Sequence, residues 1–190
     1  NYIEFRFSDI NSVKPEMLAE AIKNASSILI SAGAGLGVDS GLPDFRGAEG
    51  FWRAFPAYRE LGINFTQMAN PKRFREDPEG SWGFYGHRQN MYRETNPHQG
   101  YQILKSWTKN KDFFIYTSNV DGHFQKAGFD PNRIVECHGT LSHQQCVDCC
   151  GVGIFRASEF PIDVDVSTFR AERPLPSCPE CGGLARPNLL

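Results

Sequence analysis

The sequence lacks any apolar run near the roughly 20 residues that a membrane-spanning helix needs, so we expect no membrane partner. It also lacks an excess of one charge, because 20 basic and 22 acidic residues give a net charge of −2. Proteins that track nucleic-acid phosphates normally carry a basic excess, so we expect no nucleic acid bound by direct readout. No secretory signal opens the chain, and its six cysteines are not spread like a disulfide framework. These absences favour an intracellular, cytoplasmic protein.

The first half of the sequence contains the opening pattern of an α/β fold. Pro15 and the apolar positions at helical spacing after it predict a helix, and residues 27–31 predict a short buried strand. A glycine loop at residues 32–37 follows immediately. Further strands are predicted at 113–117 and 134–137. This order is typical of a nucleotide-binding parallel sheet.

Two cysteine pairs with CxxC spacing are Cys146 with Cys149 and Cys178 with Cys181. Two such knuckles supply four thiolates to a tetrahedral zinc ion, although a pair of disulfides or a redox dithiol would use the same pattern. Four thiolates leave no open position for water, so the predicted Zn2+ is structural. Cys137 and Cys150 remain as ordinary thiols.

The glycine loop only partly matches a dinucleotide fingerprint. Gly33, Ala34 and Gly35 begin the fingerprint, but Val38 stands where GxGxxG requires glycine. Glycine and proline prevent residues 40–47 from continuing as a regular helix. Backbone N–H groups of such a loop can cradle a pyrophosphate, and Arg46 can add a charge-assisted contact. The alternative is a structural turn with an exposed arginine.

Polar residues follow two of the predicted strands. They are Ser118, Asn119, Val120 and Asp121 after one strand and His138 after the other. Ligands of open α/β sheets bind outside the carboxyl ends of strands, and a histidine near neutral pKa is a natural general base. Each residue also has a plain structural interpretation, as a turn or cap residue or a core imidazole.

These motifs together resemble the sirtuin family of NAD-dependent protein deacylases. The resemblance rests on residues 33–47, 117–122, 127–128 and 138–139 and on the two CxxC pairs, in that order. It covers about residues 18–187. It implies a Rossmann-like α/β fold with a small zinc-binding insert and a helical cleft wall. NAD and a structural Zn2+ are the implied cofactors, and an acyl-lysine protein or peptide is the implied substrate.

The resemblance also assigns roles to individual residues. NAD would be bound by Gly33, Ala34, Gly35, Asp44, Phe45, Arg46, Ser118, Asn119, Val120 and Asp121. His138 would act as general base on the ribose hydroxyls and Asn119 would orient the ribose or a water. The reaction would transfer an acyl group (acetyl, succinyl or malonyl) from lysine to the ADP-ribose part of NAD. Its products would be O-acyl-ADP-ribose, nicotinamide and free lysine. Protein ADP-ribosylation, NAD hydrolysis and a non-catalytic NAD-binding module are the alternatives.

The resemblance predicts the domain organisation, although the sequence departs from the family's motifs at several positions. The Rossmann-like NAD-binding domain would consist of residues 1–47 and 93–141, and the helical cleft segment of residues 48–92. Residues 142–187 would form the zinc-binding domain, and residues 188–190 would begin a truncated return to the sheet. Ser118 stands where the family usually has glutamine, and the family's usual serine or threonine is replaced near Gly37 and Val38. Because a sirtuin continues into further strands, we expect the natural protein to be longer.

Tyr85 and Arg88 lie three residues apart in the predicted cleft wall. Sirtuins that prefer acidic acyl groups carry a similar Tyr-x-x-Arg pair. A guanidinium binds a carboxylate bidentately and a tyrosine hydroxyl adds a donor. The pair therefore predicts desuccinylase or demalonylase capability, against the alternative of a core aromatic beside an exposed arginine.

Overall fold

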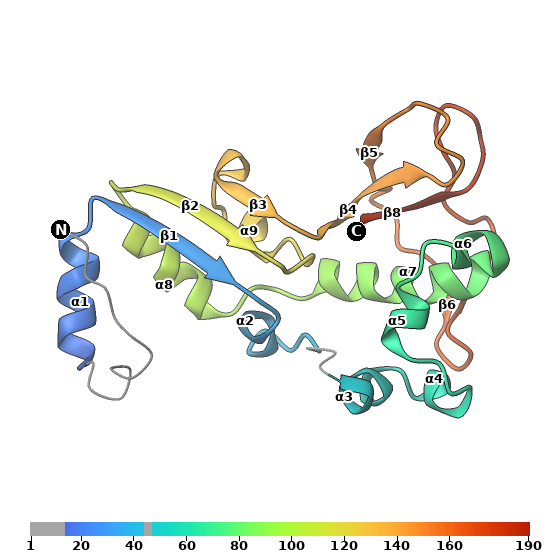
Figure 1. Cartoon of the computed structure of the whole chain (residues 1–190), viewed down its shortest axis with the longest axis horizontal. Helices are drawn as coiled ribbons and strands as arrows, with labels where there is room; N and C mark the ends of the chain where they lie inside the picture. The colour runs from blue at the N-terminus through green and yellow to red at the C-terminus, as the bar shows by residue number, and fades with distance from the viewer. Residues whose placement is uncertain (1–13, 44–46) are drawn as a thin grey trace.

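A computed structural model describes residues 14–43 and 47–190 of the chain (Figure 1). Its helices are α1 Pro15–Asn24, α2 Gly35–Val38, α3 Gly47–Ala54, α4 Pro56–Glu60, α5 Phe65–Met68, α6 Arg73–Glu76, α7 Pro78–Glu94, α8 Gln99–Thr108 and α9 His123–Lys126, with a 3-10 turn at Pro131–Arg133. Its strands are β1 Ser27–Ala32, β2 Asp112–Thr117, β3 Ile134–Glu136, β4 Gly139–Cys146, β5 Ile154–Arg156, β6 Val164–Asp165, β7 Arg170–Ala171 and β8 Ala185–Leu189. Among the described residues, no helix is both long and apolar enough to cross a bilayer.

Strands β1, β2 and β3 form a parallel sheet in that order, which confirms the predicted α/β class. Ile30 and Ile115 are register partners and are buried on one face of the sheet. Tyr101 of α8 and Phe124 of α9 pack against them in one apolar cluster. The three predicted strands agree with the observed ones to within one residue at each end.

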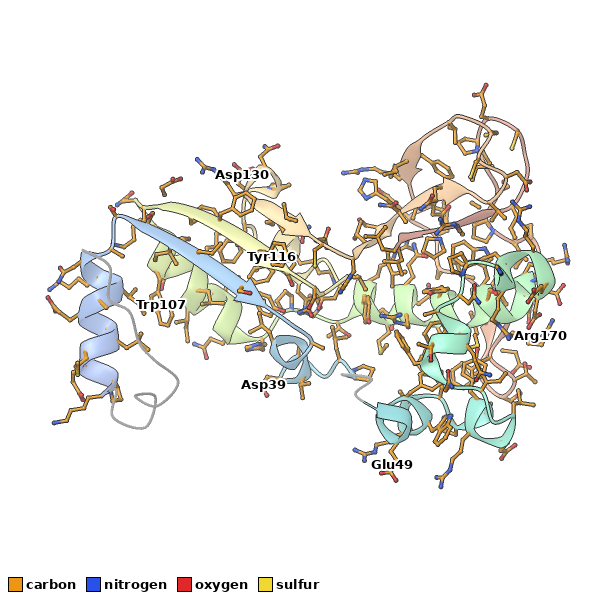
Figure 2. The ribbon with its side chains drawn as sticks, viewed as in Figure 1. Asp39, Glu49, Trp107, Tyr116, Asp130 and Arg170 are labelled. Carbon is orange, nitrogen blue, oxygen red and sulfur yellow. The ribbon has the colours of Figure 1, made fainter. Side chains whose placement is uncertain are left out.

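The opposite face of this sheet is uncovered over the described residues. Leu29 and Phe114 are register partners on that face and are 71% and 39% exposed. Tyr116 of β2, labelled in Figure 2, and its β3 partner Val135 are 48% and 40% exposed. Because side chains alternate between the faces of a strand, one face is covered by helices and the other is apolar and open.

The second part of the chain is built around a cluster of aromatic rings. Helices α3–α7 and strands β4, β6, β7 and β8 gather on one side of Figure 1. Phe51, Phe55 and Phe84 are fully buried, and their ring centroids lie 5.1–5.8 Å apart. Phe169, from the loop before β7, adds a ring 5.1 Å from Phe55. The helical segment and the zinc-binding insert of the prediction therefore share one core.

Helix α7 is the central support of this core. The Asp77 side chain caps it by accepting a hydrogen bond from Gly80 N at 3.2 Å, and Pro78 occupies the first turn, where proline is tolerated. Ten of its 17 residues are buried. Arg170 of β7, labelled in Figure 2, forms ion pairs with Asp77 and Glu79 at 3.0 and 2.9 Å. These contacts fix the N-terminal turn of α7 against β7.

The segment from β4 to β8, residues 139–189, forms a small module that contains both cysteine pairs, and the last strand pairs within it. β5, β4 and β8 form an antiparallel sheet in which Gly139 and Thr140 face Leu189 and Asn188. Residues 188–190 are predicted to begin a return to the parallel sheet, and residues 188 and 189 pair here with the first two residues of β4. β8 pairs with both ends of β4, and the register shifts between Thr140 and Gln144.

Candidate functional site

The carboxyl ends of β1 and β2 bring the glycine loop and the residue 118–121 turn together. Asn119, which is buried, donates from Nδ2 to the Gly33 carbonyl at 3.0 Å. Ser118 N donates to the Ala32 carbonyl, also at 3.0 Å, and so extends the β1–β2 pairing by one residue. Thr117 Oγ1 accepts from Asn119 N at 3.0 Å and fixes the start of the turn. Two segments that are 86 residues apart in sequence thus form one rigid edge.

A small pocket of about 80 Å3 lies at this edge. Its lining residues are Ala34, Gly37, Leu42, Pro43, Arg88, Tyr92, Ser118, Asn119, Val120 and Asp121. A Cβ on Gly37 would lie 3.4 Å from Leu42 Cδ1 and 3.5 Å from Asp121 Oδ2, so the loop backbone lies in close contact with the Asp121 carboxylate. The pocket lining thus combines an amide, a carboxylate, hydroxyl groups and a guanidinium with the apolar side chains of Leu42, Pro43 and Val120.

The structure brings some of the predicted cofactor residues into this pocket, but not all of them. Ala34 and the four residues from Ser118 to Asp121 line it, while the neighbouring Gly33 and Gly35 are not among its lining residues. Asp44, Phe45 and Arg46 lie outside the described residues. A larger hollow of about 650 Å3 lies in the small module and is lined by none of the predicted site residues.

His138 lies in the turn that joins β3 to β4 and is exposed. The residues on either side of it are tied to the same turn as Asn119. Cys137 N donates to the Thr117 carbonyl at 2.9 Å, and Leu141 N donates to the Val120 carbonyl at 3.4 Å. Gly139 has a φ of +81°, and a Cβ there would lie 2.1 Å from the Asn188 carbonyl oxygen. Glycine is therefore required at position 139, directly after His138, where β8 pairs with the first residue of β4.

Two titratable groups beside the turn were not singled out by sequence. Burial raises the pKa of Glu136 to about 7, with a further contribution from the nearby Asp121 charge. Burial lowers the pKa of His123, whose backbone N–H donates to Asp121 Oδ1 at 2.9 Å. Glu136 lies two residues before His138, and His123 lies two residues after Asp121. This proximity to predicted site residues was the only feature of the sequence that indicated them. The Asp121 charge therefore acts on two groups that lie outside the motif.

Arg88 and Tyr85 occupy different positions around α7. Arg88 is buried, lines the pocket and donates from Nε and Nη2 to Tyr92 Oη at 3.2 and 2.9 Å. Tyr85 is stacked on Phe74 with a centroid distance of 5.6 Å and lies outside the lining of this pocket. Burial raises the pKa of the Tyr85 hydroxyl. Tyr92 was not predicted as a site residue, although its four-residue spacing from Arg88 on a helix places the two side chains together.

Four free thiols form a compact group in the small module. They are those of Cys146, Cys150, Cys178 and Cys181, and all lie within 4.8 Å of one another. Cys146 and Cys181 Sγ are 3.7 Å apart and Cys150 and Cys178 Sγ are 3.5 Å apart. Zinc–sulfur bonds of about 2.3 Å give tetrahedral sulfur–sulfur edges of about 3.8 Å. The residues present therefore fit a zinc ion with no position left for water.

The membership of this group corrects the sequence assignment. Cys149 was expected as the fourth ligand and Cys150 as an ordinary thiol, whereas Cys150 belongs to the group and Cys149 does not. The reason lies in the backbone, because Cys149 N bonds to the Cys146 carbonyl at 3.3 Å and Cys149 turns at a φ of +52°. The turn leaves Cys149 exposed and brings the next residue to the other thiols.

Fold and site together define a Rossmann-like α/β protein with a four-thiol module. The sequence profile of the Sir2 family matches residues 33–190. The chain belongs to the Sir2 family.

Curated relatives support the same assignment. An NAD-dependent protein deacylase of Thermus thermophilus is 32% identical over 183 residues, which cover 92% of this chain and 63% of that protein. An NAD-dependent protein deacylase of Aquifex aeolicus is 30% identical, over 86% of this chain and 60% of that protein. An NAD-dependent protein deacetylase of Saccharolobus solfataricus is 31% identical, over 92% and 64%. The chain thus spans about three fifths of the length of these relatives.

Solved structures agree with this result. A crystal structure of a Sir2 homologue in complex with NAD matches with a TM-score of 0.71 and 28% identity, over 92% of this chain and 60% of that chain. A Sir2 homologue variant in complex with ADP-ribose matches with a TM-score of 0.71 and 26% identity, over 94% and 63%. The Rossmann-like fold of the prediction is therefore confirmed.

Proposed function

We propose that the protein containing this chain removes acyl groups from protein lysines in an NAD-dependent reaction. The observation that carries the proposal is the joining of the glycine loop and the residue 118–121 turn by the Asn119–Gly33 hydrogen bond. NAD and ADP-ribose are bound in two matching structures, and the curated relatives are deacylases and deacetylases. When bound, NAD supplies the ADP-ribosyl group that accepts the acyl group as nicotinamide leaves.

Individual residues of the chain would have separate roles in the reaction. Asp121 and the Val120 backbone would hold the carboxamide of nicotinamide, since a carboxylate accepts from an amide N–H. Asn119 would orient the ribose, because its Nδ2 is already fixed on Gly33. His138 would take the proton of a ribose hydroxyl at its imidazole. The loop residues Gly33, Ala34 and Gly35, with Asp44, Phe45, Arg46 and Ser118, complete the proposed cofactor-binding set.

The pocket cation suggests an acyl preference. Arg88 is buried on the pocket wall, and its guanidinium carbon lies 5.2 Å from the Phe84 ring centroid. A carboxylate entering the pocket could accept from this guanidinium, so we propose activity on succinyl- or malonyl-lysine beside acetyl-lysine. Tyr85 is the second residue of the proposed acyl site, since its ring centroid lies 6.0 Å from the Arg88 guanidinium carbon, and the Tyr92 hydroxyl supports the position of Arg88.

The thiols support a proposal for the cellular setting of the protein. All six cysteines are free, and four of them are arranged for a metal. Free thiols in such a group persist in a reducing compartment, so we propose that the protein works in the cytoplasm.

The test is nicotinamide release from NAD by the intact protein in the presence of succinyl-, acetyl- and unmodified lysine peptides. We expect release that depends on an acylated peptide and falls by at least about 100-fold in His138→Ala, within the range of general base catalysis. His143→Ala is the matched control, because His143 lies on β4 outside the pocket lining. Release without peptide would instead indicate NAD hydrolysis or ADP-ribosylation. NAD binding without release would indicate a non-catalytic module.

A further inference from the structure

His98, the residue directly before α8, contacts the glycine loop through both its side chain and its backbone. Its imidazole Nε2 lies 3.0 Å from the Leu36 carbonyl oxygen, and its backbone N–H donates to Ser40 Oγ at 3.0 Å. Leu36 belongs to α2, which Figure 1 shows beside the start of α8. The segment from Leu36 to Ser40 is therefore held at both of its ends by one residue of another element.

The hydrogen bonds of His98 determine which imidazole nitrogen carries the proton. Gly100 N–H donates to His98 Nδ1 at 3.0 Å, and this bond caps the first turn of α8. An imidazole that accepts at Nδ1 is neutral and carries its proton on Nε2, so Nε2 donates to the Leu36 carbonyl. A Cβ on Gly100 would lie 2.4 Å from His98 Cε1, so the ring folds back over a position that needs glycine. One side chain thus caps α8 and also holds the glycine loop.

The held segment forms one wall of the pocket at the strand ends. Gly37, which lies between the two contact points, lines this pocket, and a Cβ on it would lie 3.5 Å from Asp121 Oδ2. His98 itself is not among the lining residues, so it can influence the pocket only through the loop. The position of the loop at Leu36 and Ser40 therefore sets how closely Gly37 approaches Asp121.

Three rings connect this support to the opposite wall of the pocket. The centroids of the His98 and Tyr101 rings lie 5.1 Å apart and those of Tyr101 and His123 lie 5.6 Å apart, each pair edge to face. Tyr101 and His123 are fully buried. The backbone N–H of His123 donates to Asp121 Oδ1 at 2.9 Å. Because buried, closely packed rings resist displacement, the two walls share one rigid support.

We propose that His98 is a positioning residue of the cofactor pocket, which fixes the glycine loop relative to Asp121 through the hydrogen bond from Nε2 to the Leu36 carbonyl. The proposal rests on the proposed NAD-dependent function, because it concerns the same pocket. Loss of this hydrogen bond should weaken NAD binding by about three- to tenfold, which is the range expected for one neutral hydrogen bond.

Two substitutions at His98 separate the capping of α8 from the positioning of the loop. Asparagine is a favoured N-cap and keeps an acceptor for Gly100 N–H, but its shorter side chain does not reach the Leu36 carbonyl. Glutamine is a poorer N-cap, but its longer side chain carries an amide donor as far as Nε2. We expect His98→Asn to keep wild-type stability and to raise the Kd for NAD about three- to tenfold. His98→Gln should be less stable but bind NAD within about twofold of wild type.

Thermal unfolding and isothermal titration calorimetry of the intact protein with NAD measure these two effects. Asn64→Ala is the control for loss of a helix cap, because Asn64 Oδ1 accepts from Gln67 N at 2.9 Å at the start of α5, outside the pocket lining. This variant should be less stable and bind NAD as wild type does. In steady-state assays, His98→Asn should raise the KM for NAD and leave the KM for the acylated peptide unchanged.

Two results would overturn the proposal. One is an equal Kd for NAD in wild type and His98→Asn. The other is an equal weakening by His98→Asn and His98→Gln, because the hydrogen bond to Leu36 would then not be the cause. Wild-type protein that binds no NAD would contradict the proposed function itself and remove this proposal with it, which is a different result from an unchanged variant.

Nuclear magnetic resonance of the wild-type protein gives a second test that does not depend on the folding of a variant. Long-range 1H–15N correlation spectra report which imidazole nitrogen carries the proton. We expect the His98 proton on Nε2, as the bonds to Gly100 and Leu36 require. A proton on Nδ1 would leave no donor for the Leu36 carbonyl and would overturn the proposal.

Discussion

Arg88 is the side chain on which the proposed acyl preference depends. A charge-assisted hydrogen bond to a carboxylate contributes about 1.5–3 kcal/mol, and about 1.4 kcal/mol corresponds to a factor of ten. We therefore expect Arg88→Met to lower the ratio of kcat/KM for succinyl- over acetyl-lysine peptide by at least about tenfold. Methionine retains apolar contact with the Phe84 and Tyr92 rings.

The control for Arg88 is Arg93→Met on the same helix. Arg93 contacts the Phe160 and Ser158 carbonyls and lies outside the pocket lining, so the ratio should not change. An unchanged ratio in Arg88→Met, or an equal fall for both peptides, would exclude Arg88 as the carboxylate-binding residue.

Glu136 makes stability depend on pH. Its pKa is raised to about 7 by burial, whereas an unfolded glutamate has a pKa of about 4.3. Between these values the folded protein holds a proton that the unfolded chain has released. This contribution is present below the unfolded pKa and is lost as pH rises through about 7.

We accordingly expect Glu136→Gln, which mimics the protonated acid, to be more stable than wild type at pH 8 and nearly equal at pH 4.5. The difference should be on the order of 1 kcal/mol, because partial exposure screens the charge. Urea unfolding at the two pH values measures it. Glu60→Gln, at an exposed carboxylate that ends α4, should leave the pH dependence unchanged. Parallel pH profiles for wild type and Glu136→Gln would contradict this account.

At the scale of elements, the close approach of α7 to β7 requires a glycine. A Cβ on Gly83 would lie 1.7 Å from the Phe169 carbonyl oxygen and 2.9 Å from Arg170 Cα, both backbone atoms. Alanine in a helix interior is normally favoured over glycine by about 1 kcal/mol. Gly83→Ala should instead lower the free energy of unfolding by about 1–3 kcal/mol or more, because α7 must shift from β7.

Gly86→Ala is the matched substitution one turn further along. Its Cβ would meet Ile162 Cγ2 at 2.8 Å and Ile162 Cβ at 3.0 Å, whereas the Cβ on Gly83 would overlap the Phe169 backbone at 1.7 Å, so a much smaller shift would relieve the contact at Gly86. Thermal unfolding followed by circular dichroism should therefore show a clearly smaller loss than for Gly83→Ala. Equal losses would mean that the backbone contact at Phe169 does not limit the packing.

Some of the elements and site residues could be predicted from the sequence, and others could not. Strands β1, β2 and β3 were predictable because each is a short apolar run between turn residues, and their parallel order follows from the helices between them. The pocket turn at residues 118–121 was predictable because ligands gather at strand ends. The choice between Cys149 and Cys150 was not, since it depends on one φ angle. The location of Tyr85 depends on how α7 is rotated within the core, which spacing alone does not fix.

At the scale of the whole molecule, the two halves differ in how completely they are covered. The half around α7 has an aromatic core enclosed by helices and by the small module. In the other half, the parallel sheet is covered by α8 and α9 on one face and, among the described residues, leaves Leu29, Phe114 and Tyr116 exposed on the other. Parallel sheets are normally buried on both faces. The halves are therefore expected to respond separately when one of them is perturbed.

Removal of zinc is the perturbation that distinguishes the halves. Binding of zinc to thiolate sites contributes about 10–16 kcal/mol, which is comparable with the whole net stability of a domain at about 5–15 kcal/mol. A chelator should therefore release the knuckle hydrogen bonds, such as Val147 N to the Leu184 carbonyl at 2.9 Å. Amide exchange should then rise in β4 and β8 and should spread to the first turns of α7, where Trp82 Nε1 donates to the Ala185 carbonyl at 2.9 Å.

Strands β1 and β2 contribute no cysteine to the four-thiol group. The amides of their paired residues should therefore stay protected from exchange after chelation. Re-addition of zinc should restore protection in β4 and β8, which serves as the control for irreversible damage. Equal loss of protection in β1 and β2 would mean that the two halves unfold as one cooperative unit. No change in β4 would mean that the four thiols do not hold the metal. Exchange at the Val147 amide, which directly follows the last residue of β4 and donates to the Leu184 carbonyl, is therefore the most direct measure of whether zinc stabilises the small module.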